Sequence, residues 1–309
     1  MDKFLEQHVV LSDEVATALF EGRGVVALET TIVVHGLPAP INLEVANECA
    51  KAVRNAGSVP ATIGVLGGKI VVGLRDDELE ELASPRRHAA KLSARDLGVA
   101  IANEVDGATT VAGTIAVARA VNIDVMATGG LGGVHRGAQQ TFDESADLTA
   151  LSRTSIAVVA SGVKSILDIG ATLERLDSLG VPVVGYRTTR FPGFYRSDSG
   201  FGVDWSMESP RDVASAFRAH RLFSPTGMLI ANPVQQSVQL DATLHDDALA
   251  SALQKANDLG VTGKDVTPVV LAEFANYTGG KSVQVNRDLV VANASVASQI
   301  AFELAGSRS

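Results

Sequence analysis

The sequence predicts an α/β fold in which one domain, residues 1–309, is built around a largely buried sheet. Hydrophobic residues make up 46% of the chain but aromatic residues only 5%, so Ala, Val, Ile and Leu must form the core, as they do in buried strands and their covering helices. Short apolar runs alternate with amphipathic helical patterns, which is typical of β-loop-helix units. No low-complexity linker divides the chain, so we expect a single domain.

Strands and helices are predicted to alternate through the N-terminal part of the chain. In order, we expect a helix over 12–21, a strand over 24–28, a helix over 42–56, a hairpin over 61–74, a helix over 76–82 and a short extended run ending at Lys91. Ser12 or Asp13 should cap the first helix, and the first strand should deliver Glu29 at its end. Gly67 and Gly68 can take the positive φ angles of a tight antiparallel hairpin.

The remaining elements continue this alternation. We expect a helix over 107–120, a strand over 156–160, a helix after Lys164 that runs through Leu179, strands over 181–186 and 227–233, and mostly helix over 241–305. Thr267 should cap a helix whose first residue is Pro268. Residues 190–208 have no clean period, so we expect an irregular excursion over the edge of the sheet or a subunit contact.

Composition and charge argue against several classes of protein. The formal net charge of −9 disfavours a surface for nucleic-acid polymers. No apolar run approaches the roughly 18 residues of a membrane span, and the first residues lack the layout of a secretory signal, so we expect a cytoplasmic protein with no membrane partner. The one cysteine, Cys49, excludes an intrachain disulfide and should be a small core residue on a helix.

A glycine-rich stretch at residues 126–148 is the most informative part of the chain. Its glycines let backbone approach a ligand closely, and Asp143, Ser145 and Asp147 supply carboxylates and a hydroxyl where a helix should begin. The stretch matches neither the dinucleotide fingerprint nor a P-loop. Shortly after it, Lys164 follows a buried strand, at the sheet edge where open α/β folds bind ligands.

Six polar side chains are expected at strand ends or loops on the same rim: Glu29, Lys91, Asp143, Ser145, Asp147 and Lys164. Each alone has an ordinary explanation, because strand-end carboxylates usually belong to ion pairs or caps. A lysine after a strand usually pairs with phosphate or extends into solvent, yet a lysine desolvated among small apolar groups can be a Schiff-base nucleophile. Both alternatives stay open for Lys164. His35 and His135 lack the spacing of a zinc site.

Several long motifs occur in order along nearly the whole chain. They are Ala-Leu-Glu-Thr-Thr-Ile at 27–32, His-Gly-Leu-Pro at 35–38, Val-Pro-Ala-Thr-Ile at 59–63, Gly-Ala-Thr-Thr-Val-Ala at 107–112, Ala-Thr-Gly-Gly-Leu-Gly-Gly-Val-His-Arg-Gly-Ala at 127–138, Thr-Phe-Asp-Glu-Ser-Ala-Asp-Leu at 141–148, Gly-Val-Lys-Ser-Ile-Leu-Asp at 162–168 and Thr-Gly-Gly-Lys-Ser-Val-Gln-Val-Asn at 278–286. With these motifs the chain resembles the pseudouridine-5′-phosphate glycosidases, or indigoidine synthase A-like proteins.

The resemblance implies a three-layer α/β/α sandwich around a mixed β-sheet, and a cytoplasmic homotrimer. It implies a lyase that reversibly cleaves the C-glycosidic bond of pseudouridine 5′-phosphate to uracil and ribose 5-phosphate. By the same resemblance Glu29 is the proton donor, Lys164 the Schiff-base nucleophile and Asp143 a ligand of Mn²⁺. Positions that match substrate-binding residues of the family are Lys91, Val111, Thr128, Ser145, Ala146, Asp147 and Asn286. Residues 197–224 match the family poorly.

The residues suit that chemistry, because a carbon leaving group is not released by protonating a heteroatom as in an N-glycoside. If Glu29 protonates the ring oxygen while neutral Lys164 attacks C1′, the ribose opens to a lysine adduct, and an iminium can form as the bond from C1′ to C5 breaks. Two other functions remain open. One is a Schiff-base aldolase acting on a sugar phosphate, and the other is a non-catalytic phosphosugar-binding protein.

Overall fold

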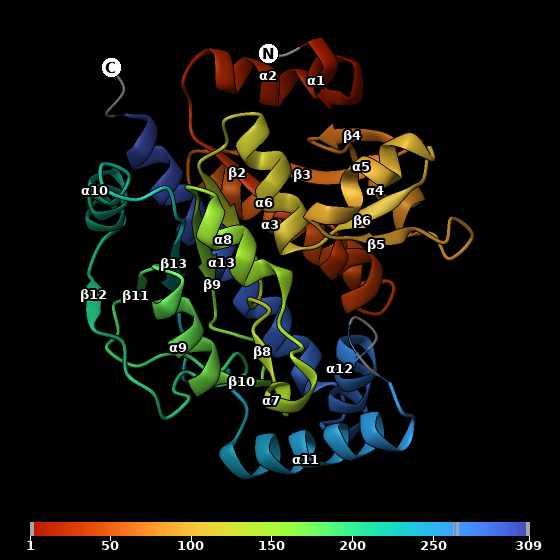
Figure 1. The fold of residues 1–309 in the computed structure, drawn as a ribbon, viewed down its shortest axis with the longest axis vertical. Coiled ribbons are helices and arrows are strands. Elements are labelled where there is room, and N and C mark those ends of the chain that lie inside the picture. The colour runs from red at the N-terminus through yellow and green to blue at the C-terminus, as the bar shows by residue number, and fades with distance from the viewer. Residues whose placement is uncertain (1–2, 262, 264–265, 307–309) are drawn as a thin grey trace.

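A large, mostly parallel sheet forms the middle layer of the computed structural model, which describes residues 3–261, 263 and 266–306 (Figure 1). The strands are β1 (Val9–Leu11), β2 (Val25–Glu29), β3 (Val59–Leu66), β4 (Lys69–Val72), β5 (Ala90–Leu92), β6 (Gly107–Thr109), β7 (Val125–Ala127), β8 (Val134–His135), β9 (Ala157–Ala160), β10 (Leu167–Asp168), β11 (Val183–Tyr186), β12 (Trp205–Met207) and β13 (Met228–Ala231). The main path runs β1-β4-β3-β2-β7-β9-β13-β11-β12, and β6 joins it by pairing with β3 and β5.

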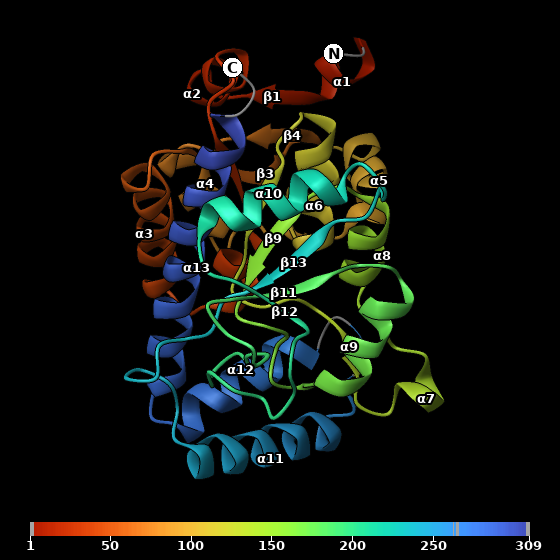
Figure 2. The ribbon, with the colours of Figure 1, turned by 90° about the vertical axis from the view of Figure 1, so that its left-hand side faces the viewer.

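Helices cover both faces of this sheet (Figures 1 and 2). They are α1 (Lys3–His8), α2 (Asp13–Phe20), the π-helix η1 (Ile32–Gly36), α3 (Ile41–Asn55), α4 (Asp76–Ala83), the 3₁₀ turn η2 (Ala94–Asp96), α5 (Leu97–Ala102), α6 (Val111–Ala120), α7 (Ala138–Thr141), α8 (Ala146–Arg153), α9 (Ile169–Ser178), α10 (Pro210–His220), α11 (Ala242–Asp258), α12 (Val266–Tyr277) and α13 (Lys281–Ala305). Helices α3, α10 and α13 pack on one face, and α6 and α8 on the other. This confirms the three-layer α/β/α fold.

Strand β2 lies inside the sheet, paired in parallel with β3 and β7, and all five of its residues are buried. From β3 through β2, β7, β9, β13 and β11 to β12 every pairing on the main path is parallel. The carboxyl ends of these strands therefore meet at one edge, as the sequence predicted, and Glu29 is placed there. Strands β3 and β4 are antiparallel, with Gly67 and Gly68 at φ 54° and 73° in their turn, which confirms the predicted hairpin.

The predicted helices α2 and α3 are also confirmed. The Ser12 hydroxyl accepts a hydrogen bond from Val15 N at 3.3 Å and so caps α2. Helix α3 buries Val45, Cys49 and Val53, and it packs against α13. Cys49 is thus the buried core residue expected from its helical spacing.

Three predicted boundaries are wrong. The helix predicted over 107–120 begins only at Val111, because Gly107–Thr109 forms strand β6, where Leu92 packs so closely on Gly107 that a Cβ there would lie 2.2 Å from Leu92 Cδ1. The helix predicted to follow Lys164 begins only at Ile169, because Asp168 caps α9 by accepting from Ala171 N at 3.0 Å and β10 pairs with β8.

The third wrong boundary concerns the C-terminal part, which is mostly helical as predicted. Thr267 lies within α12 and so is not its cap, while Pro268 lies in the first turn of that helix. Residues 264–265, where a cap would be sought, are outside the described residues. Within 190–208, most of the chain is irregular as predicted, but Trp205–Met207 forms the edge strand β12, parallel to β11.

No helix in the described ranges is both long and apolar enough to cross a membrane.

One buried amide links the ends of three neighbouring strands. Asn293 of α13 is fully buried, and its Nδ2 donates to the carbonyl oxygen of Thr128, just after β7, at 2.8 Å. Its Oδ1 accepts from Asn232 Nδ2, just after β13, at 2.8 Å. The Ser161 hydroxyl, just after β9, lies 3.1 Å from Nδ2 and 3.3 Å from Oδ1. Helix α13 thereby holds the carboxyl ends of β7, β9 and β13 in register with one another.

Replacing this amide by an apolar side chain of similar size should therefore be costly. Asn293→Leu leaves the buried Thr128 carbonyl and Asn232 amide without their partner, and each such group costs about 1–3 kcal/mol. We expect the free energy of unfolding to fall by about 2–5 kcal/mol in urea titrations. Gln284→Leu, at an exposed position of the same helix, should change it by less than about 0.5 kcal/mol. Equal stability of the two variants would contradict this role.

Candidate active site

Five of the residues singled out in the sequence line one pocket at the carboxyl edge of the sheet. They are Glu29, Lys91, Thr128, Lys164 and Asn286. Glu29 ends β2, Thr128 follows β7 and Lys164 follows β9, so three neighbouring parallel strands deliver them to the same edge. Helix α13 supplies Asn286 from one face of the sheet.

Glu29 is the most deeply placed ionisable group in this pocket, with only 8% of its surface exposed. The Thr128 hydroxyl donates a hydrogen bond to Glu29 Oε1. Burial raises the pKa of Glu29 because the charged form loses its hydration, and the charge of Asp147 acts in the same direction; Lys164, Thr128 and Lys91 oppose it. Glu29 can therefore hold a proton at a pH where an ordinary glutamate has lost it, as a general acid must.

The glycine-rich loop is tied directly to the segment that carries Lys164. The backbone N–H of Lys164 donates to the Leu131 carbonyl at 3.1 Å, and Ser161 N donates to the Gly129 carbonyl at 2.9 Å. Leu131 and Val163 form an isolated parallel bridge between the two segments. These bonds hold Lys164 beside the loop, half-buried at the pocket wall.

Lys91 reaches the pocket from the side of the sheet formed by β5 and β6, where it pairs in register with Ala108. His35 Nε2 lies 3.1 Å from the Ala89 carbonyl, so η1 is bonded to the chain just before β5. Both lysines act electrostatically on Glu29. The pocket thus combines one buried acid with two lysine side chains.

The other predicted substrate-binding residues form a neighbouring cluster at the first turns of α6 and α8. Its members are Val111, Ser145, Ala146 and Asp147. Asp147 Oδ1 accepts from Ala112 N and Oδ2 from Gly132 N, both at 2.9 Å. The Ser145 hydroxyl caps α8 by accepting from Asp147 N at 3.2 Å. Asp147 therefore joins the N-terminus of α6 to the glycine-rich loop, and its charge helps to raise the pKa of Glu29.

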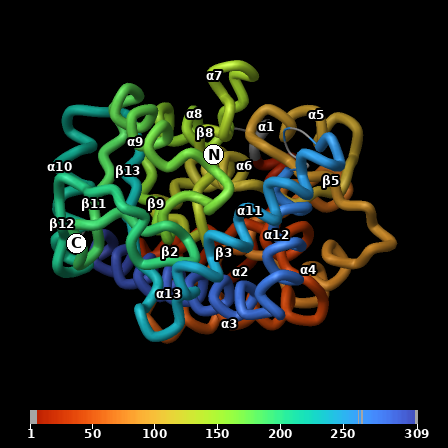
Figure 3. The backbone as a smooth tube through the Cα atoms, turned by 90° about the horizontal axis from the view of Figure 1, so that it is seen from below, coloured from red at the N-terminus to blue at the C-terminus, as the bar shows by residue number. Residues whose placement is uncertain are grey.

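Asp143 lies in the loop between α7 and α8, and helix α7 stands away from the body of the molecule in Figures 2 and 3. Its Oδ2 is 3.7 Å from His135 Nδ1. Burial lowers the pKa of His135, the charges of Lys164 and Lys91 lower it further, and Asp143 raises it. Within the described part of the chain no group of three or more His, Cys, Asp and Glu residues is arranged to hold a metal. Asp143 suits only a hydrated hard cation that keeps most of its waters.

Sequence reasoning missed one aromatic residue of the pocket wall, Phe194. It belongs to the segment that was expected to be an irregular excursion, and it is buried with a left-handed φ of 64°. The preceding Pro192 and Gly193 do indicate a turn. Nothing local, however, predicts that the next side chain points inward.

Residues 14–303 match the protein family described as indigoidine synthase A like protein. The chain is similar to the pseudouridine-5′-phosphate glycosidase of Salinispora tropica, with 58% identity over 97% of this chain and 93% of that protein. It is also similar to the crystal structure of the prealnumycin C-glycosynthase AlnA in complex with ribulose 5-phosphate, with a TM-score of 0.89, 40% identity and 98% of each chain covered. An indigoidine synthase A-like protein from Thermotoga maritima has a TM-score of 0.87 and 35% identity, covering 96% of this chain and 97% of the other.

The burial of Glu29 makes a prediction about stability and pH. Its ordinary pKa is 4.5 and the folded value is higher, so its contribution to stability is complete below about pH 4.5 and is lost as the pH rises through the folded value. Glutamine does not ionise. Glu29→Gln should therefore melt at a higher temperature than the unsubstituted protein at pH 7, and the gap should shrink towards pH 4.

The matched control is Glu80→Gln, at an exposed position of α4. Its melting temperature relative to the unsubstituted protein should not change in this way with pH. If Glu29→Gln instead melts below the unsubstituted protein at pH 7 and this difference shrinks towards pH 4, the lysines lower the pKa of Glu29 by more than burial raises it.

Proposed function

Since the chain belongs to the indigoidine synthase A-like family, we propose that it is a lyase that reversibly cleaves the C-glycosidic bond of pseudouridine 5′-phosphate, giving uracil and ribose 5-phosphate. The observation that carries this proposal is a buried acid, Glu29, in one pocket with Lys164. The names of the relatives support it, because one is a pseudouridine-5′-phosphate glycosidase and the other is a C-glycosynthase in complex with a sugar phosphate, ribulose 5-phosphate.

We propose that Glu29 and Lys164 open the ribose ring. Neutral Lys164 Nζ attacks C1′ while the bond from C1′ to the ring oxygen breaks, and Glu29 gives its proton to that oxygen. The raised pKa of Glu29 favours the protonated form that this step requires. The product is an open ribose chain attached to Lys164 through C1′.

In the next step the bond from C1′ to C5 of the base breaks. The nitrogen of the adduct first loses a proton, and C5 of the base gains one. The nitrogen lone pair then forms the iminium with C1′, and the bonding pair between C1′ and C5 restores the double bond of the base ring, which leaves as uracil. Water then adds to the iminium and releases ribose 5-phosphate, which returns the amine. The balance is one water consumed and no redox change, so no further co-reactant is required.

The phosphate and the base have separate partners in this proposal. Lys91 offers a compact positive charge to the 5′-phosphate, and the helix dipoles at the N-termini of α6 and α8 favour an anion nearby. In the same pocket, Asn286 Oδ1 is buried and has no hydrogen-bond partner among the residues that the structure describes. It can accept from a ring N–H, which uracil attached through C5 keeps at both nitrogens.

We propose that Asp143 binds Mn²⁺. The support is chemical: a half-exposed carboxylate can hold a hard divalent ion that keeps its other waters, and His135 Nδ1 lies 3.7 Å from this carboxylate. When bound, the ion would supply positive charge and orient water molecules. A homotrimer in the cytoplasm is proposed from the family resemblance.

Two other functions make different predictions for the same residues. A Schiff-base aldolase would use Lys164 but would split a carbon chain and release a shorter aldehyde. A phosphosugar-binding protein would bind the nucleotide without turnover, and it would have no need for a buried acid beside a lysine. The pairing of Glu29 with Lys164 in one pocket therefore favours the glycosidase.

The test is to incubate the purified protein with pseudouridine 5′-phosphate and Mn²⁺ and to measure both products. We expect uracil and ribose 5-phosphate in equal amounts, and at least about a 10³-fold loss of kcat in Lys164→Ala. Lys255→Ala, on α11 outside the pocket, should keep full activity. A short aldehyde without uracil would favour the aldolase, and binding without turnover would favour the binding protein.

The metal proposal has its own test, which does not depend on turnover. Binding of Mn²⁺ can be followed by the electron paramagnetic resonance signal of the free ion. Asp143→Ala should weaken binding by at least about 10-fold and shift the melting temperature by less than about 2 °C, because a loop carboxylate contributes little to the core. Glu144→Gln, whose side chain pairs with Arg175, should bind as the unsubstituted protein does. A collapsed melting temperature in Asp143→Ala would mean that the residue is structural.

A further inference from the structure

We propose that Phe194 is a specificity-determining residue whose ring forms the wall against which the pyrimidine ring of the substrate lies. This inference rests on the proposed function and names the part of the pocket that recognises the base. Phe194 comes from the irregular segment between β11 and β12, and it lines the same pocket as Glu29 and Lys164.

The ring of Phe194 packs directly on the glycine-rich loop. A Cβ at Gly130 would lie 2.6 Å from Phe194 Cδ2 and 3.5 Å from Lys164 N. A Cβ at Gly129 would lie 3.5 Å from Phe194 Cε2 and 3.3 Å from Asn286 Oδ1. The aromatic ring, the buried acceptor Oδ1 of Asn286 and the backbone of Lys164 thus converge on two consecutive glycines. An apolar face beside a hydrogen-bond acceptor suits a flat heterocycle that carries N–H groups.

The position of this convergence agrees with the chemistry. The base is joined to C1′, the atom that Lys164 attacks, so it must lie beside Lys164 at the moment of bond cleavage. Lys91 reaches the pocket from β5, and that strand pairs with β6 on a side branch of the sheet. If the phosphate binds at Lys91 and the base at Phe194, the two ends of one nucleotide contact different walls of the pocket.

The backbone at Phe194 is held in a costly conformation by specific contacts. Its φ of 64° is left-handed, which is unfavourable for a bulky residue and persists only where the surroundings impose it. Phe194 N donates to the Ser161 carbonyl at 3.0 Å, and Gly193 bridges to Gly162. These contacts join the segment to the turn just before Lys164. The ring and the lysine are thus positioned by the same few residues.

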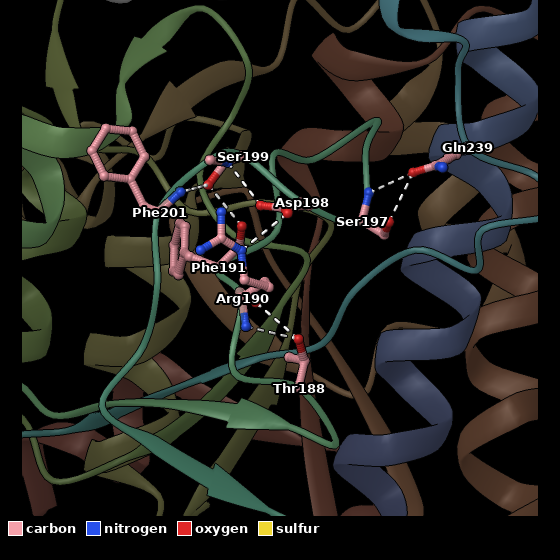
Figure 4. Close-up of polar contacts among 9 residues, drawn as sticks. Thr188, Arg190, Phe191, Ser197, Asp198, Ser199, Phe201 and Gln239 are labelled. Carbon is pink, nitrogen blue, oxygen red and sulfur yellow. Dashed lines mark hydrogen bonds and ion pairs between the residues drawn. The ribbon is translucent and has the colours of Figure 1, made fainter.

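The rest of the segment is fixed by its own polar contacts, as Figure 4 shows. Arg190 Nε lies 3.0 Å from Asp198 Oδ2, and the Ser199 hydroxyl donates to the Phe191 carbonyl at 2.7 Å. Ser197 donates to Gln239 Oε1 from both its backbone N and its hydroxyl, at 2.8 Å and 2.9 Å. The segment is therefore a preformed wall, so the ring is in place before substrate binds.

Further aromatic side chains support the ring from behind. The Tyr195 ring lies edge-on to Phe194, with centroids 4.6 Å apart, and Phe274 follows at 5.1 Å from Tyr195. Phe194 itself is only 3% exposed. Such packing limits rotation of the ring in the pocket wall.

The experiment measures the reverse reaction, because there the base and the sugar are separate substrates. With uracil and ribose 5-phosphate, Phe194→Leu should raise KM for uracil about 10-fold to 100-fold, which is the size of a lost contact between an aromatic ring and a base. KM for ribose 5-phosphate should change by less than about 3-fold. Phe194→Tyr keeps the ring and should restore KM for uracil to within about 3-fold.

The control is Phe201→Leu, in the same segment but packed against Gly170 outside the pocket; it should leave both KM values unchanged. If Phe194→Leu does not fold, Phe194→Met provides the same comparison with a side chain closer in length. Equal rises in the two KM values, or an unchanged KM for uracil, would overturn the assignment while the proposed function stands. No product from the unsubstituted protein would overturn both.

Discussion

The burial of the Glu29 carboxyl at the end of β2 is the constraint on which the rest of the site depends. Burying a carboxyl group is costly unless it is protonated, hydrogen-bonded or paired with a positive charge. Glu29 has a raised pKa, accepts a hydrogen bond from the Thr128 hydroxyl and interacts with the charges of Lys164 and Lys91. Thr128 is held in turn by Asn293 through its carbonyl. A residue on the last helix therefore helps to set the environment of an acid on the second strand.

The site also depends on side chains that pack closely against backbone. Gly129 and Gly130 allow the Phe194 ring and Asn286 to reach the loop, and Gly132 leaves room for Ser145 and Asp147, whose atoms would lie 2.2 Å and 2.6 Å from a Cβ at that position. The glycine-rich stretch was read from the sequence as a place where a ligand meets backbone. In the structure, the space beside these glycines is occupied largely by the protein's own side chains, which position the pocket residues.

Much of this arrangement could be predicted because it follows from local patterns. A few neighbouring residues were enough to predict the strand before Glu29, the strand before Lys164 and the Gly67-Gly68 turn, and the structure contains all three. The segment from Gly107 could not be assigned correctly, because small residues suit both a strand and a helix and only its pairing with β3 and β5 decides between them. The inward turn of Phe194 depends on Ser161 and Gly162, which are distant in the sequence.

The central claim is that Lys164 becomes covalently attached to the sugar, with Glu29 opening the ring. The most direct measurement is reduction with borohydride in the presence of pseudouridine 5′-phosphate, followed by intact-mass analysis and peptide mapping. The account predicts a reduced ribose phosphate on the peptide that contains Lys164 (residues 162–168), little adduct in Glu29→Ala, and none in Lys164→Ala although that variant still binds the nucleotide. Adduct on Lys91 instead, or full turnover by Lys164→Ala, would contradict it.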